Sequence, residues 1–195
     1  PCRIARISFS GEMASEIYVP SDYGPALMDL LWGAAKSLGG CLYGLEALGT
    51  MRIEKGHVTG AELDGRVTLE DAGLTKMAST KKHFVGNTLR KRPEMIKEGR
   101  PQLVGIFPEN IDETFNAGSI ICNESDINGH GEGWVTAVTY SAVFDHWIGI
   151  GFITGGHQNW QNKVAIAADP IRNKETRIKI ISPHMYDPEG KRHYG

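Results

Sequence analysis

Residues 6–20 read RISFSGEMASEIYVP and are typical of a β-hairpin. β-Branched and aromatic residues stand on both sides of Ser10-Gly11, which is a turn signal. In an extended second strand, Glu12 and Glu16 would share one face, because side chains alternate along a strand. The opposite face would be apolar enough to bury. We therefore expect a hairpin that presents carboxylate acceptors to a ligand.

The composition is that of a globular protein without a strong overall charge. Of 195 residues, 41% are apolar, and 21 Lys and Arg residues stand against 23 Asp and Glu residues. This balance offers no global attraction to nucleic acid, and the densest basic patch, Arg90-Lys91-Arg92, is interpreted as a solvated face. No apolar run approaches the roughly 20 residues that span a bilayer, and no secretory signal opens the chain. We expect a cytoplasmic protein with no nucleic-acid or membrane partner.

The cysteines and histidines do not suggest a metal or redox centre. Cys2, Cys41 and Cys122 are far apart and lack a C-x-x-C spacing, so we expect buried thiols in a reducing compartment. The histidines show neither HExxH nor i,i+4 helical spacing. The sequence therefore predicts no metal site.

Helical signals dominate the first half of the chain. Apolar residues recur at helical spacing from Ser21, a candidate N-cap, to the stop at Gly39-Gly40. Three further helices are expected over 44–54, 67–77 and 87–98. Thr68 and Asp71 have the spacing of a capping box for the helix over 67–77.

After Pro101 the pattern changes to short apolar runs separated by turn residues. These runs predict strands over 103–107, 119–122, 135–140, 148–153, 164–166 and 176–181. The fold class is therefore predicted as α+β. We expect one α+β domain over residues 1–98 and a small antiparallel β-barrel domain over residues 102–195.

Four blocks of sequence occur in an order that is typical of one family. They are SFSGE at 8–12, GLEALGTMRIEKGH at 44–57, STKKHFVG at 79–86 and SPHMYDPEG at 182–190. With these blocks the chain resembles the tetrahydrofolate-binding aminomethyltransferases, the glycine cleavage T-protein family. The resemblance runs from near residue 3 to the last residue. Within the family it is closer to the C-terminal part of the alpha subunits of heterotetrameric sarcosine oxidase.

The resemblance implies both an architecture and an activity. Residues 1–98 would be the C-terminal half of a folate-binding domain, partial in this chain, and residues 102–195 the barrel that follows it. In these oxidases a flavin on the beta subunit oxidises sarcosine, and the alpha subunit passes the one-carbon unit to tetrahydrofolate, forming 5,10-methylenetetrahydrofolate. FMN, FAD and NAD are expected only in the full heterotetramer, where the beta, gamma and delta subunits are the partners.

The resemblance also implies that this chain is a fragment of a longer subunit. The aspartate regarded as central to the transfer lies in a preceding half of the folate domain and has no counterpart here. We therefore name no catalytic residue and expect the isolated chain to be inactive. Two alternatives stay open: an independent T-protein-like aminomethyltransferase, and a non-catalytic folate-binding or subunit-interaction module.

Two cofactor-binding candidates lie in the hairpin. A pterin presents a ring N–H beside an exocyclic amine, and a carboxylate can accept both bonds at once. Glu16 matches the second glutamate of the family's hairpin, which binds the pterin; a surface-strand glutamate is the alternative. Glu12 could hold the turn or contact the ligand. Phe9 stands where related enzymes often have tyrosine, and its ring could stack beside the pterin or pack in the core.

Two further candidates come from the other blocks. Leu48 occupies a position where T-proteins carry a folate-binding arginine, whereas sarcosine oxidase alpha subunits have an apolar residue there, so Leu48 favours the oxidase branch. Tyr186, with Tyr194 as the alternative, matches a tyrosine that lines the family's folate pocket. Arg52, Glu54 and Lys55 are consistent with an internal ion-pair network that positions their helix.

Overall fold

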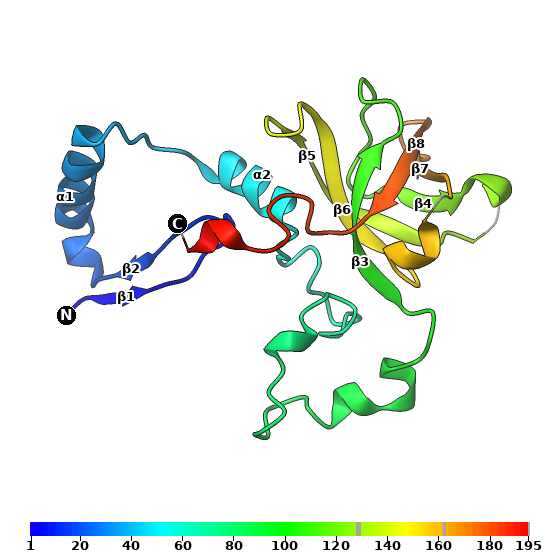
Figure 1. Cartoon of the computed structure of the whole chain (residues 1–195), viewed down its shortest axis with the longest axis horizontal. Helices are drawn as coiled ribbons and strands as arrows, with labels where there is room; N and C mark the ends of the chain where they lie inside the picture. The colour runs from blue at the N-terminus through cyan, green and yellow to red at the C-terminus, as the bar shows by residue number, and fades with distance from the viewer. Residues whose placement is uncertain (128–129, 162, 195) are drawn as a thin grey trace.

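The N-terminal part of the computed structural model is a hairpin followed by two helices, and the structure describes residues 1–127, 130–161 and 163–194. Strand β1 (Arg3–Ala5) pairs antiparallel with β2 (Glu16–Tyr18). A 3-10 turn (Ser21–Tyr23) leads into helix α1 (Gly24–Ser37), and helix α2 (Leu45–Lys55) follows. Figure 1 shows the hairpin and α1 at one end of the molecule and α2 beside the barrel.

The α1 prediction is correct in extent but not in its cap. The helix begins after Tyr23, with Pro25 in its first turn, and Ser21 belongs to the preceding 3-10 turn. Gly39 adopts φ +77° just after the helix ends, as the glycine stop predicted. No residue of α1 is buried, and its apolar stripe is only partly covered by other described residues.

The second half is a closed six-stranded barrel, and all six predicted strands are confirmed. The strands are β3 (Pro101–Pro108), β4 (Ile120–Asn123), β5 (Gly133–Ser141), β6 (His146–Thr154), β7 (Ala165–Asp169) and β8 (Lys174–Ile181). Their order around the barrel is β3-β6-β5-β4-β7-β8, and every paired neighbour is antiparallel. Strand β8 alternates buried and exposed residues, as a barrel wall with one solvent face does.

Two hydrophobic clusters hold these elements. The barrel interior includes Val104, Ile106 and Trp160. A second cluster lies outside the barrel wall, where Ile53 of α2 packs with Ile148 and Ile150 of β6. This explains why β6 is buried on both faces, and it fixes α2 against the barrel.

The helices predicted over 67–77 and 87–98 are wrong. Thr68 and Asp71 do form the reciprocal hydrogen bonds of a capping box, at 2.9 and 3.2 Å, but Gly73 at φ +72° ends the turn at once. Pro93 interrupts the second segment, because the residue before it, Arg92, is extended at ψ 147°. Only the 3-10 turns Thr75–Met77, Leu89–Lys91 and Pro93–Met95 form there.

Three 3-10 turns accompany the barrel and the tail, over Glu124–Asp126, His157–Trp160 and Lys191–His193. After β8 the chain leaves the barrel, passes α2 and returns to the N-terminal hairpin (Figure 1). Among the described residues, no helix has the length and apolar character needed to cross a membrane.

The cysteines differ from expectation. Cys122 of β4 is 5% exposed, but Cys2 and Cys41 lie on the surface. Burial raises the pKa of the Cys122 thiol, with nearby Glu175 and Asp126 adding to the shift.

At pH 8 we therefore expect a disulfide reagent to modify the Cys2 and Cys41 thiols rapidly and the Cys122 thiol at least about tenfold more slowly. Cys122→Ala should remove only the slow phase, and three equal rates would contradict this prediction.

Candidate functional site

The hairpin that opens the chain is shorter in its strands and longer in its connection than predicted. The pairing places Ala5 opposite Glu16, so residues 6–15 form the connection. Glu12 therefore lies outside the second strand and does not share a strand face with Glu16. Gly11 adopts φ +87° and is buried, and the Ser8 hydroxyl accepts a bond from its N–H at 3.1 Å. The glycine turn itself is confirmed.

Gly11 ties the connection to α2. A Cβ at this position would lie 2.7 Å from the Cγ and Cδ atoms of Lys55. The stem of Lys55 thus packs directly on the backbone of the turn, a contact that the absence of a side chain at Gly11 permits. The end of α2 and the hairpin form one unit.

Glu16 presents its carboxylate on the exposed side of β2. Its Oε2 accepts a hydrogen bond from the hydroxyl of Tyr18, two residues along on the same strand face. This bond raises the pKa of the Tyr18 phenol. Its Oε1 takes part in none of the side-chain hydrogen bonds among the described residues. The strand therefore offers an exposed carboxylate with a phenol beside it.

Phe9 lies next to the loop that follows α2. Its carbonyl accepts a hydrogen bond from His57 Nδ1 at 2.9 Å, and the two rings are 6.4 Å apart at their centroids. Burial lowers the pKa of His57, with smaller contributions from His193 and Lys55, while the bond to Phe9 opposes the shift. The Phe9 side chain remains 36% exposed. Its ring is therefore only partly available to a ligand.

The last turn of α2 carries the predicted internal network, which the structure confirms. Arg52, Glu54 and Lys55 bind three different segments of the chain. Arg52 Nη1 lies 2.9 Å from Glu62 Oε2, and the Glu62 side chain is fully buried. Glu54 Oε1 accepts from the Ser141 hydroxyl of β5 at 2.5 Å. These contacts join α2 to the loop after it and to the barrel.

Lys55 completes this network by binding the tail, residues 182–194. Its ammonium donates to the carboxylate of Asp187 at 2.8 Å and to the carbonyl of the same residue at 2.6 Å. The Lys55 bond is the main cause of the lowered pKa of Asp187. Asp187 also accepts from the backbone N–H groups of Lys191 and Arg192. Asp187 was not among the residues identified from the sequence.

The tail then reaches the hairpin. Arg192 Nε donates to Glu12 Oε1 at 2.6 Å, and its guanidinium lies 5.4 Å from the centre of the Tyr186 ring. Tyr186 donates its backbone N–H to the Glu54 carbonyl at 2.9 Å, whereas Tyr194 is 83% exposed. Glu12 therefore has a structural partner, and Tyr186 lies between α2 and the hairpin.

Leu48 lies two turns before Lys55 on α2 and is half-buried. Its apolar side chain takes no part in the polar contacts that join α2, the hairpin and the tail. The structure thus gathers Phe9, Glu12 and Tyr186 around the end of α2, with Glu16 at the start of β2. The ligand roles of Glu16, Phe9, Leu48 and Tyr186 stay predictions.

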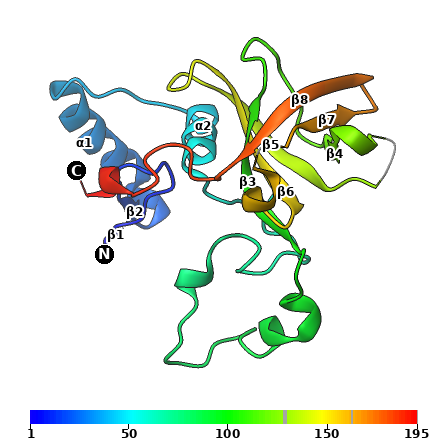
Figure 2. The same ribbon diagram turned by 45° about the vertical axis from the view of Figure 1, so that its right-hand side comes forward.

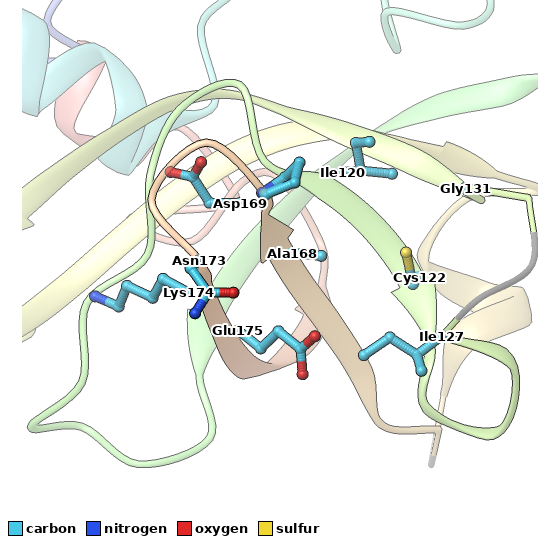
Figure 3. A pocket seen from close by; sticks show the side chains of 10 residues that line it. Ile120, Cys122, Ile127, Gly131, Ala168, Asp169, Asn173, Lys174 and Glu175 are labelled. Atoms are coloured by element: carbon cyan, nitrogen blue, oxygen red, sulfur yellow. The ribbon is translucent and has the colours of Figure 1, made fainter.

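A separate hollow of about 350 Å³ lies on the barrel and is shown in Figure 3. Its buried carboxylate, Asp169, and its Lys174 ammonium are already engaged within the chain. Asp169 accepts bonds from Asn116 at 2.9 Å and from Arg172 at 2.7 Å, and Lys174 donates to Thr114. The hollow therefore lacks a free buried group that would select a ligand. In residues 1–127, 130–161 and 163–194, no group of three or more His, Cys, Asp or Glu side chains is arranged to hold a metal.

Comparison with known families gives two matches along the chain. The model described as GCVT N-terminal domain matches residues 1–82. The model described as glycine cleavage T-protein C-terminal barrel domain matches residues 102–187, which contain all six barrel strands apart from Pro101 of β3. Together the two models account for most of the chain.

Two known proteins of these families are similar in sequence to nearly the whole chain. "Sarcosine oxidase subunit alpha" of Rhizobium meliloti (strain 1021) is 35% identical over 96% of this chain, which covers 19% of that protein. "Aminomethyltransferase" of Thermoanaerobacter sp. (strain X514) is 28% identical over 98% of this chain, which covers 50% of that protein. The chain thus spans a fifth to a half of the length of these relatives.

A solved structure shares the fold. The crystal structure of glycine cleavage system aminomethyltransferase T from Bartonella henselae matches with a TM-score of 0.79 and 22% identity. The match covers 96% of this chain and 50% of that chain. At this identity, the likeness concerns the fold alone.

Proposed function

The chain belongs to the glycine cleavage T-protein family, and on that premise we propose that it is the tetrahydrofolate-binding part of a one-carbon transfer enzyme. The pterin would bind beside the hairpin, where the end of α2 and the tail hold the connection in place. The observation that carries this proposal is the exposed Glu16 carboxylate. One of its oxygens accepts from Tyr18, and the other is free of side-chain bonds in the described part of the chain.

We further propose that the parent protein is of the sarcosine oxidase alpha type. The support is the 35% identity along nearly the whole chain, together with Leu48 in place of the arginine expected in T-proteins. In this proposal the parent works with beta, gamma and delta subunits, and the FMN, FAD and NAD sites lie outside residues 1–195. The one-carbon unit removed from sarcosine would end on tetrahydrofolate.

The chain's contribution would be binding and orientation. Tetrahydrofolate supplies the nucleophilic nitrogen that takes up the one-carbon unit. Glu16 would accept the two adjacent donors of the pterin, and the Phe9 ring would pack against its face. Lys55 would not contact the pterin but would position the hairpin, because it packs on the Gly11 turn and binds the tail. Such positioning converts a bimolecular encounter into a reaction within one complex.

Substitution of the carboxylate tests this proposal. We expect Glu16→Gln to weaken tetrahydrofolate binding by about 1.5–3 kcal/mol, the scale of a hydrogen bond to a charged group. The amide keeps one acceptor but turns an N–H donor toward a pterin donor. Isothermal titration calorimetry under anaerobic conditions measures the change, on residues 1–195 and on the intact parent protein.

Glu98→Gln is the matched control, because Glu98 is an exposed glutamate outside the hairpin and should leave the affinity unchanged. Equal affinities of the Glu16→Gln variant and the unaltered protein would remove Glu16 from the site. If tetrahydrofolate binds only to the parent protein, the pocket is shared with segments outside residues 1–195. In that case the tetrahydrofolate affinities of the parent protein with and without Glu16→Gln are compared.

A further inference from the structure

Residues 73–99, here called the basic lobe, extend away from the barrel and α2 (Figures 1 and 2). All of these residues are described, and none of them is buried. The lobe instead exposes large apolar side chains: Met77 is 77% exposed, Val85 102%, Leu89 53% and Ile96 63%. Val85 and Leu89 line the same hollow, and exposed apolar patches of this kind mark interaction sites.

The lobe also concentrates positive charge. The whole chain has a formal net charge of −2, whereas the lobe contains seven Lys and Arg residues against Glu94 and Glu98. Six of the seven lie within residues 72–93, which contain no Asp or Glu. They are Lys76, Lys81, Lys82, Arg90, Lys91 and Arg92. Such local asymmetry creates a positive potential that attracts acidic groups. Arg90-Lys91-Arg92 is thus the densest part of a larger basic surface.

A hollow of about 330 Å³ lies at the base of this surface. Apolar side chains, including Phe84, Leu89 and Met95, line it together with Arg90 and Arg92. Arg90 Nη1 lies 2.8 Å from Glu70 Oε1, and its guanidinium lies 5.9 Å from the centre of the Phe84 ring. Arg90 Nε is shielded from solvent and has no hydrogen-bond partner among the described residues. The hollow is therefore apolar inside, and the exposed Arg92 is among the residues that line it.

We propose that the basic lobe binds an acidic segment of a partner protein. One apolar side chain of the partner would enter the hollow, and an Asp or Glu residue beside it would pair with Arg92. Buried apolar anchors supply most of the affinity at such sites, while charged rims set the rate and the specificity of association. The proposal goes beyond folate binding and does not depend on it.

The same surface is less suited to other ligands. Single-stranded nucleic acid binds to several aromatic side chains interleaved with basic ones, and Phe84 is the one aromatic residue of the lobe apart from His83. Membrane surfaces are bound by amphipathic helices, whereas the helical turns of the lobe are three residues long. A concave hollow fits a single side chain of a peptide better than either.

Fluorescence anisotropy with defined peptides tests the proposal. The probe is a short labelled peptide of Glu and Asp with one central Leu, and the comparison peptide has Ser in place of Leu. We expect the Leu peptide to bind at least about tenfold more tightly, and its affinity to fall as salt is added. Val85→Asp and Arg92→Glu should each weaken its binding about tenfold or more.

The two variants change exposed side chains, so the protein should keep its unfolding transition. Lys36→Glu is the matched control: it makes the same charge change as Arg92→Glu on the exposed surface of α1 and should leave the binding unchanged. Equal binding of the Leu and Ser peptides would reduce the lobe to a charged, solvated face and overturn the proposal. Tighter binding to anionic vesicles or single-stranded DNA, or self-association that Val85→Asp abolishes, would overturn it in favour of those occupants.

Discussion

Replacement of Arg52 by methionine is expected to lower the free energy of unfolding by about 3–5 kcal/mol, because it leaves a buried charge without its partner. Glu62 is fully buried, and Arg52 Nη1 lies 2.9 Å from its Oε2. Thr59 donates two further bonds to the same oxygen, at 2.7 and 3.0 Å, but these donors are neutral. Glu62 Oε1 has no hydrogen-bond partner in the described part of the chain. Denaturation with urea measures the loss.

A second substitution separates the charge from the packing. In Arg52→Met with Glu62→Gln, the amide oxygen can still accept from Thr59, and no charge is left buried. We expect this double variant to recover most of the lost stability. Lys97→Met is the control for an exposed pair, since Lys97 and Glu94 are 67% and 79% exposed, and its effect should stay within about 1 kcal/mol. A cost of Arg52→Met no larger than that of the control would contradict a buried ion pair.

The barrel could be predicted from the sequence because each strand carries its own signal. Apolar runs such as 148–153 are bounded by turn residues, and the closed barrel gives each of them an interior to face. The helix expected over 44–54 forms as α2 (Leu45–Lys55), and Gly56 ends it in the left-handed conformation. Local pattern and tertiary environment agree at these positions.

The two missed helices show where local pattern fails. The first was supported by the capping-box spacing of Thr68 and Asp71, but Gly73 and Pro93 interrupt the backbone of the two segments, and residues 73–99 expose their apolar side chains. Most helical stability in proteins comes from packing an apolar face, and residues 73–99 do not bury one. Local helix signals without an apolar face to bury were not enough.

The candidate site was only partly predictable for a different reason. The hairpin turn and the charged end of α2 were visible as short motifs, but the contacts that join them come from the tail. Lys55 and Asp187 are 132 residues apart, and Glu12 and Arg192 are 180 residues apart. Single-sequence patterns do not report such pairs. The closing block SPHMYDPEG, which contains Asp187, was the only local signal that the tail belongs to the site.

Gly56→Ala is expected to destabilise the protein by about 2–5 kcal/mol, through backbone strain and a collision with the tail. Gly56 adopts φ +74°, where a side chain costs about 1–2 kcal/mol. A Cβ there would also lie 2.3 Å from the Pro183 carbonyl oxygen and 2.8 Å from its carbon. Both atoms are backbone, so the tail itself must move. We expect faster proteolysis of residues 182–194 as well as a lower unfolding midpoint in urea.

Gly39→Ala isolates the contribution of the tail. Gly39 follows α1 at φ +77°, but nothing lies within 4 Å of a Cβ at that position. The same substitution there carries the backbone strain without the collision, so about 1–2 kcal/mol should be lost and the tail should stay protected. The difference between the two variants then measures how firmly the tail is held against α2. If the two variants lose equal stability and the tail resists proteolysis in both, Pro183 moves away at little cost in free energy. In that case the tail does not fix the hairpin to α2.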